Sequence, residues 1–169
     1  MNPFDTSLLI LRVVAGLTFI AHGVNHARNI EGTTRWFAKV GFRSAPIQAR
    51  MSILVEVGAG ALLVAGFLTS LAAAALVATM TVAALAVHRF NGFFVFRPGE
   101  GWEYVHVLGW VGFVIAWLGA GSYSLDNVLG LDWGTGLGLL FGVGGAAMGV
   151  VQLLAFWRKA SDPKRPGGE

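Results

Sequence analysis

Long apolar stretches alternate along the chain with short polar ones, and this pattern predicts its architecture. Each of the five stretches is near the roughly 20 residues that a helix needs to cross a bilayer. They are Ser7–Val24, Met51–Leu68, Leu71–His88, Tyr104–Gly121 and Thr135–Trp157. We therefore expect an all-α membrane protein whose helices run back and forth across the bilayer.

The second and third stretches are separated by Thr69 and Ser70 alone. Together they are far too long for one crossing, so we expect a tight hairpin with antiparallel helices. Proline breaks the interior of a helix, and every proline of the chain lies outside the five stretches. These prolines are Pro3, Pro46, Pro98, Pro163 and Pro166.

Composition supports the same interpretation. Hydrophobic residues make up 55% of the 169 residues and charged residues 12%, about half the charged share of a typical soluble domain. We expect an integral membrane protein in contact with lipid, in a bacterial plasma membrane. The sequence contains no cysteine, which excludes disulfides, thiolate metal sites and dithiol redox chemistry.

The basic residues predict an orientation in the membrane. Of the 12 Lys and Arg residues, all but Arg12 fall in three regions on one side of a five-helix path. They are Arg28, Arg35, Lys39, Arg43, Arg50, Arg89, Arg97, Arg158, Lys159, Lys164 and Arg165. Cytoplasmic loops carry the excess of Lys and Arg, so we expect the N-terminus outside and the C-terminus in the cytoplasm. The basic pI of 9.8 then reflects topology, and no nucleic-acid partner is expected.

Two connections have structure of their own. Thr33–Phe42 is expected to form an interfacial helix, capped by Thr33 or Thr34, with its basic and aromatic residues on separate faces. The aromatic run Phe90–Phe96 contains a glycine and is too short to span. We expect it to fold back against the inner membrane surface.

The fifth apolar stretch carries small residues at every fourth position. Such a ladder lets helix backbones approach closely, so it predicts a contact face. Its members are Gly134, Gly138, Gly142 and Ala146. The partner is either the bundle itself or another subunit.

Ionisable residues within or at the ends of membrane helices cost roughly 2.5–3.5 kcal/mol each on insertion scales, so they point to a function. Here they are Arg12, His22, His26, Glu56, His88, Glu103 and His106. In the five-helix path, every histidine and both glutamates fall in the cytoplasmic half. We predict one cavity in that half, lined by His22, Glu56, His88 and His106 beside Phe93 and Phe94.

A buried glutamate facing histidines can take up and release protons near neutral pH. This chemistry suits a quinone, whose reduction consumes two protons. We assign Glu56 and His88 to proton exchange, and His22 and His106 to contact with a quinone headgroup. Several alternatives remain open: wetted helix ends for the histidines, a structural role for Glu56, plain packing for the aromatic run, or ligation of a metal or haem, for which no spacing is diagnostic.

Six short stretches together resemble the DoxX family of small membrane proteins, in family order between Leu8 and Asp126. They are LLILRVVAGLTFIAHG (8–23), EVGAG (56–60), GFLTSLAA (66–73), VHRFNGFF (87–94), WEY (102–104) and GSYSLD (121–126). The resemblance implies a four-helix membrane bundle at residues 1–126. The apolar and charge patterns add an outer loop and fifth helix at 127–157 and a basic cytoplasmic tail at 158–169. It also implies a respiratory or redox role, including small subunits linked to quinone oxidoreduction.

The resemblance further implies functional polar positions, which match Arg12, His22, Glu56, His88, Asn91 and Asp126. We include Asn91 with Phe93 and Phe94 among the expected ligand-binding residues, and we predict a structural ion pair between Arg12 and Asp126. The chain departs from the family in having His26 where a lysine is common, and in its fifth helix, which suggests docking to other subunits.

The leading hypothesis is therefore a quinone-linked redox membrane protein acting within a larger complex. A non-catalytic accessory or scaffold subunit is the alternative, which the small-residue ladder favours. A small-solute or proton transporter is a third possibility, although no apolar stretch is interrupted at its middle.

Overall fold

The computed structural model describes residues 2–131 and 133–158, and this part of the chain is built of helices joined by turns and loops, without strands. The elements are α1 (Pro3–Arg28), α2 (Ile30–Val40), α3 (Ala45–Ala65), α4 (Thr69–Ala83), the π-helix η1 (Ala84–His88), α5 (Glu103–Leu118), α6 (Leu125–Val128) and α7 (Gly134–Phe156). The predicted all-α membrane fold is confirmed. Which side of the membrane each terminus faces stays a prediction.

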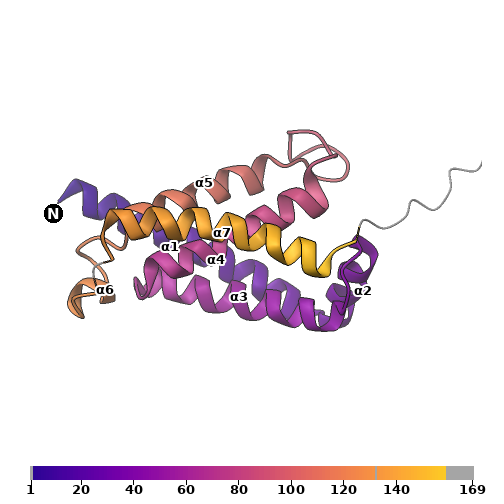
Figure 1. Ribbon diagram of the computed structural model, residues 1–169, viewed down its shortest axis with the longest axis horizontal. Helices are drawn as coiled ribbons and strands as arrows, with labels where there is room; N and C mark the ends of the chain where they lie inside the picture. Colours follow the sequence, from indigo (N-terminus) through magenta and orange to yellow (C-terminus); the bar gives the residue numbers. More distant parts are fainter. Residues whose placement is uncertain (1, 132, 159–169) are drawn as a thin grey trace, which may run out of the picture.

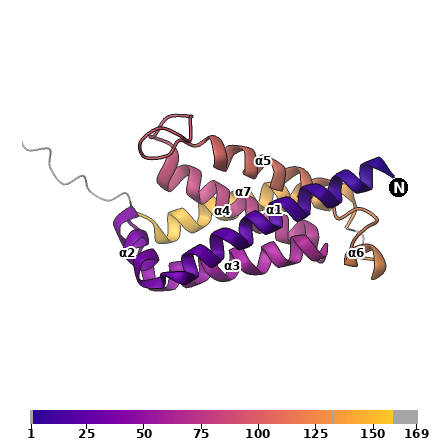
Figure 2. The same cartoon turned by 180° about the vertical axis from the view of Figure 1, so that it is seen from behind.

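The long helices α1, α3, α4, α5 and α7 lie side by side in an elongated bundle (Figure 1). Helix α4 lies at the centre and contacts α3, α5 and α7, while α1 packs along α3. Seen from behind, α1 crosses α3 and approaches α5 (Figure 2). The short helices α2 and α6 lie at opposite ends of the bundle.

Within the described residues, four helical stretches are long and apolar enough to cross a membrane. They are Pro3–Arg28, Ala45–Ala65, Thr69–His88 and Gly134–Phe156. Helix α5 is apolar but has only 16 residues. At 1.5 Å per residue it is about 24 Å long, less than the roughly 30 Å of a bilayer core. The predicted fourth span is thus a shorter helix than the other four.

The basic residues gather at one end of the bundle. Apart from Arg12, those that are described belong to the end of α1, to α2 and the connection after it, to the start of α3, to the segment after η1 and to the end of α7. All of these segments lie at the end opposite the N-terminus (Figure 1). We call it the basic end. Lys159, Lys164 and Arg165 of the predicted tail, and Asp132 of the outer loop, lie outside the described residues.

Asparagines rather than threonines cap the first two helices. The Asn2 side chain accepts a 3.0 Å hydrogen bond from the amide of Phe4, at the start of α1. At the start of α2, Asn29 Oδ1 accepts one of 2.9 Å from the amide of Gly32. The predicted caps at Thr33 and Thr34 were wrong, because the helix begins three residues earlier than the pattern indicated and Thr33 lies within it.

The hairpin between α3 and α4 turns at Gly66–Leu68 rather than at Thr69 and Ser70. Gly66 has a φ of 66° and Leu68 a φ of 47°, both left-handed. Glycine adopts such a φ without steric cost, which explains its place at the end of α3. Thr69 and Ser70 are the first residues of α4 and are buried.

Glycines set the closest helix contacts. A Cβ added to Gly16 would lie 2.6 Å from the carbonyl oxygen of Gly60, and one added to Gly60 would lie 2.7 Å from that of Gly16. Helices α1 and α3 therefore touch backbone to backbone, as small residues allow in membrane bundles. This contact was not predicted from the sequence, because its two glycines lie on different helices and form no repeat along either one.

The small-residue ladder of α7 packs inside the bundle. A Cβ on Gly138 would lie 2.5 Å from the carbonyl oxygen of Ala116, and one on Gly142 would lie 2.9 Å from the ring of Phe113, both on α5. Gly134, at the helix start, is exposed. A second pair, Gly145 and Gly149, lies against α4, where added Cβ atoms would come within 2.4 and 2.6 Å of backbone oxygens. The contact face thus serves the bundle itself.

Candidate functional site

Glu56 is the buried acid of the bundle. It lies 11 residues after the start of α3, about three turns along the helix, and only 4% of its surface is exposed. The hydroxyl of Ser52, one turn earlier, donates a 2.5 Å hydrogen bond to Oε1. The other oxygen, Oε2, is buried and has no hydrogen-bond partner within the described part of the chain. Such an orphaned acceptor is costly and calls for an explanation.

His26 is the nearest basic group to that oxygen. Its Nε2 lies 3.9 Å from Glu56 Oε2, from the last turn of α1. The imidazole stacks on Trp36, with ring centroids 6.3 Å apart, and meets the edge of Phe37 at 6.5 Å. The aromatic face of α2 therefore fixes the ring that faces the acid. His26 was predicted to be one of the ionisable residues of the membrane helices, but it was not assigned to the site.

Tyr104 links a second histidine to the site. Its hydroxyl shares a 3.1 Å hydrogen bond with His22 Nε2, and the two rings stack 5.5 Å apart. This bond joins α1 to the first turn of α5. His22 is exposed to the surroundings at this contact between α1 and α5. Tyr104 was missed as a site residue, although a hydroxyl beside Glu103 at the start of an apolar stretch was an available signal.

Gly23 brings Glu56 under α1. A Cβ on Gly23 would lie 2.9 Å from the Cβ of Glu56 and 2.7 Å from a methyl of Val57. Only glycine leaves room for α3 at this point. The missing side chain of Gly23 thus leaves space for Glu56 next to the His22 ring. His26 lies four residues after His22 and therefore on the same side of α1.

His88 and Asn91 organise the segment between η1 and α5. His88 Nδ1 lies 2.7 Å from the carbonyl oxygen of Glu100, to which it donates. The Asn91 amide donates to the carbonyls of Gly99 at 2.5 Å and Glu100 at 3.3 Å. These bonds fold the segment back onto the end of η1, and none of them reaches Glu56. His88 is the last residue of the π-helix η1, and π-helical turns are frequent at functional sites.

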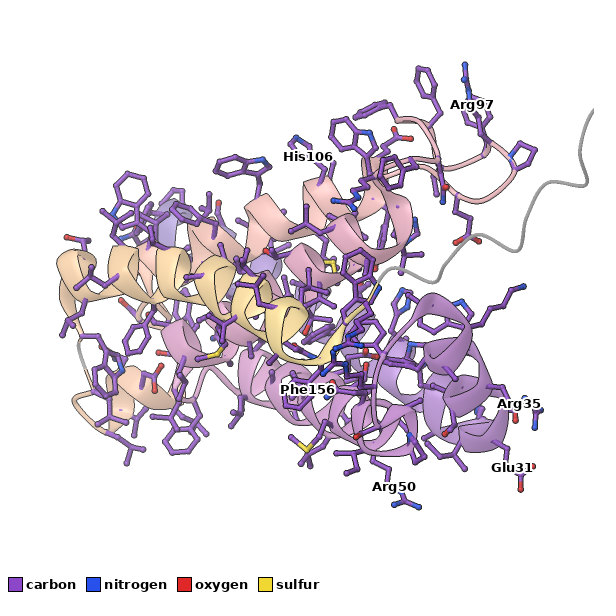
Figure 3. The ribbon with its side chains drawn as sticks, turned by 45° about the vertical axis from the view of Figure 1, so that its right-hand side comes forward. Glu31, Arg35, Arg50, Arg97, His106 and Phe156 are labelled. Atoms are coloured by element: carbon purple, nitrogen blue, oxygen red, sulfur yellow. The ribbon has the colours of Figure 1, made fainter. Side chains whose placement is uncertain are left out.

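His106 points away from Glu56. Its ring lies between Trp102, at 5.1 Å, and Trp110, at 6.2 Å, on the exposed side of α5 (Figure 3). Residues two apart on a helix differ by about 200° in direction. Because Tyr104 faces α1, His106 must face outward. The prediction that His106 joins the cluster was wrong for this reason.

Neither of the two best-defined cavities among the described residues is the predicted shared cavity. One, of about 350 Å³, lies between η1 and α7. The other, of about 390 Å³, lies at the opposite end and includes Asp5 and Asp126. Phe93 and Phe94 pack instead against each other, at 5.4 Å, and Phe93 against Trp102, at 4.8 Å. The expected site divides into two: a Glu56 cluster at the α1–α3–α5 junction, and an aromatic loop held by His88.

Arg12 and Asp126 are both buried, with 1% and 3% exposed. Arg12 Nη1 donates to the carbonyls of Leu63 and Val64 at 3.2 and 3.3 Å, and Nη2 donates to that of Tyr123. The Asp126 carboxylate accepts the amides of Leu68 and Thr69 at 2.7 and 2.9 Å. The two residues form no direct ion pair in the described structure. The predicted pair is replaced by two sets of backbone contacts at the α3–α4 turn.

No group of three or more His, Asp or Glu side chains suited to a metal ion occurs among residues 2–131 and 133–158. The described structure does contain a buried carboxyl with one unpartnered oxygen, an adjacent imidazole, and a tyrosine–histidine pair. This arrangement can hold and transfer protons.

Comparison with known proteins identifies the region that contains the Glu56 cluster. Residues 7–89 match the sequence model of the DoxX family. This part of the chain is a DoxX domain. The match covers most of α1 and continues through η1, so it includes Glu56 and both histidines beside it. Tyr104 and Asp126 follow the matched region.

A relative from Bacillus subtilis (strain 168), named "Putative oxidoreductase CatD", is 29% identical over 86 residues. The alignment covers 51% of this chain and 63% of the relative, so it spans less than two thirds of that protein's length. No solved structure shows a significant match to the chain. The comparisons thus establish a DoxX domain in a membrane protein with a relative named as an oxidoreductase.

Proposed function

We propose that this protein is a quinone-linked redox protein of the membrane, working as a subunit of a larger assembly, in which Glu56 exchanges protons. The observation that carries the proposal is the unpartnered Oε2 of Glu56, buried 3.9 Å from His26 Nε2. A carboxyl inside a membrane bundle is expensive to bury, and such residues mark proton relays. A purely structural acid would be expected to have both oxygens hydrogen-bonded.

The His22–Tyr104 pair suits the headgroup of a quinone substrate. A quinone presents two carbonyl oxygens on a flat apolar ring, which require hydrogen-bond donors and an apolar surface. The pair joins α1 to α5 and keeps one donor for a quinone carbonyl: the Nδ1–H of His22 where Tyr104 donates to Nε2, or the Tyr104 hydroxyl where Nε2 donates. Because His22 is exposed at this contact, a lipid-soluble substrate can reach it from the bilayer.

The reaction that we propose balances with two inputs. Conversion of a quinone to a quinol takes up two electrons and two protons. The sequence shows no flavin or nicotinamide fingerprint, so the electrons must come from a partner protein that carries a flavin or an iron–sulfur cluster. Glu56 and His26 would exchange the protons, since His26 stands in the last turn of α1, between the buried acid and the basic end.

The relative's name agrees with a redox role, although it names neither the substrate nor the partner. A second candidate is a non-catalytic accessory subunit. It is favoured by the outward face of α7, where Leu140, Val143 and Leu154 are 65%, 53% and 81% exposed. This apolar face lies free of the bundle and is available to lipid or to another membrane helix.

Purification of the assembly in native lipid, followed by mass spectrometry of proteins and extracted lipids, tests the proposal. We expect a quinone and a flavin or iron–sulfur protein to be retained. Glu56→Gln should lower quinone reduction by the assembly about 100-fold or more, the usual value of acid–base catalysis. The matched control is Glu31→Gln, on the exposed surface of α2. If both variants keep full activity and retain their partners, the result would favour the accessory role.

A further inference from the structure

A groove at the basic end has a composition unlike the Glu56 cluster. It has a volume of about 350 Å³ and lies where η1 runs beside the last turns of α7. Its lining residues are Leu85, Arg89, Val150, Leu153, Leu154 and Trp157. Five of these six side chains are apolar or aromatic, and the sixth is a cation.

Arg89 has no anionic partner within the described structure. Its guanidinium lies 4.5 Å from the ring centroid of Phe90 and 5.6 Å from that of Trp157. These two rings hold the cation at the mouth of the groove by cation–π contacts. No carboxylate pairs with Arg89 among residues 2–131 and 133–158, and its side chain makes no hydrogen bond there. Its donors therefore remain available for an anion.

Hydrogen bonds hold Trp157 and the end of α7 in place. The indole Nε1 of Trp157 donates to the carbonyl of Val40 at 2.9 Å. The amide of Arg43 donates to the carbonyl of Phe156 at 2.7 Å, and the amide of Arg158 donates to that of Gly41 at 3.0 Å. These bonds join the end of α7 to the connection after α2. They also place two more exposed arginines, Arg43 and Arg158, beside the residues that wall the groove.

We propose that this groove binds an anionic phospholipid, with the phosphate on Arg89 and one acyl chain along the apolar wall of η1 and α7. A guanidinium presents a fork of donors that matches a phosphate, and its charge favours an anionic headgroup. Basic pockets between membrane helices are known to take such headgroups. Among the residues that the structure describes, no acid lines the groove to repel the phosphate.

The depth of the groove agrees with this occupant. Arg89 follows directly on the span Thr69–His88, where the headgroup region begins. The apolar wall residues Leu85, Val150 and Leu154 lie within the spans, where an acyl chain lies. The inference does not depend on the redox proposal, because the groove shares no residue with the Glu56 cluster.

Native mass spectrometry of the whole protein, released from nanodiscs of equal parts POPG and POPC, tests the inference. We expect the protein to retain POPG in preference to POPC. Arg89→Gln should lower POPG retention about fivefold, the effect of one arginine near a membrane surface. Arg35→Gln is the matched control: this arginine is exposed on α2, pairs with Glu31 at 3.9 Å and does not line the groove.

A second variant separates a defined groove from general surface charge. Val150→Trp fills the groove without changing the charge, and it should lower POPG retention even though Arg89 is intact. Equal retention of POPG by Arg89→Gln and Arg35→Gln would overturn the proposal. So would equal retention of POPG and POPC by the unmodified protein, or undiminished POPG retention by Val150→Trp.

Discussion

Arg12 and Asp126 bind the same turn, between α3 and α4, through its backbone and not through each other. Arg12 donates to the carbonyls that end α3, and Asp126 accepts the amides that begin α4. Each helix end leaves such groups without helical partners. The two charged side chains satisfy these groups from both sides and fix the hairpin on which Glu56 is carried.

This arrangement predicts that Arg12 and Asp126 are energetically coupled. Arg12→Met should cost about 3 kcal/mol, because it leaves buried carbonyls without a donor. Asp126→Asn should cost about 1 kcal/mol, since one acceptor oxygen remains. Both act on one turn, so we expect the double variant to be non-additive by about 0.5–3 kcal/mol. Denaturant unfolding in detergent micelles measures this, and additive losses would show that the turn does not couple them.

The approach of α1 to Glu56 depends on Gly23. Gly23→Ala should destabilise the bundle by about 1–3 kcal/mol, because the new Cβ would lie 2.9 Å from the Cβ of Glu56. Gly58→Ala is the matched control on α3, where an added Cβ would meet no atom within 4 Å. Thermal unfolding in micelles compares the two variants. Equal stability would contradict the close packing of α1 on α3.

The glycines of α7 should differ in their tolerance of bulk. Gly138→Leu and Gly142→Leu should destabilise the bundle, because Cβ atoms there would press on α5 at 2.5 and 2.9 Å. Gly144→Leu should be tolerated, since its Cβ position is open. Chemical denaturation of the three variants provides the measurement. A Gly144→Leu variant that unfolds at as low a denaturant concentration as the other two would mean that this face of α7 also packs tightly.

Asn91 should control access to the aromatic loop. Asn91→Ala removes the bonds to Gly99 and Glu100 and should expose residues 92–101 to proteolysis. Asn25→Ala, on the exposed side of α1, serves as the control. Limited digestion followed by mass spectrometry identifies the cleavage sites. Cleavage at the same rate in both variants would show that Asn91 does not hold the loop.

The sequence predicted poorly the direction in which the polar side chains point around their helices. Charges and apolar length place Glu56 and the histidines along the bundle, because both follow from what lipid tolerates. Direction around a helix is harder, since side chains that face lipid and side chains that face the core are both apolar. This is why His106 was assigned inward and Tyr104 was overlooked, although the two are neighbours on α5.

Backbone partners were equally hidden from the sequence. Opposite charges at similar depth suggested an ion pair between Arg12 and Asp126, yet both side chains bind main-chain groups. Helix ends carry no side-chain signal for the carbonyls and amides that they leave open. The cap of α2 was misplaced for a related reason: Asn29 and Thr33 are both good capping residues, and only the helix start decides between them.

Redox-induced infrared difference spectroscopy tests the role of Glu56 most directly. The protein would be reconstituted in vesicles that contain a quinone, with electrons supplied by an electrode so that no donor protein is needed. We predict a carboxyl band that changes on quinone reduction in the unmodified protein and in Glu31→Gln, and that is absent in Glu56→Gln. An unchanged band in Glu56→Gln, or no carboxyl band in the unmodified protein, would contradict proton exchange at Glu56.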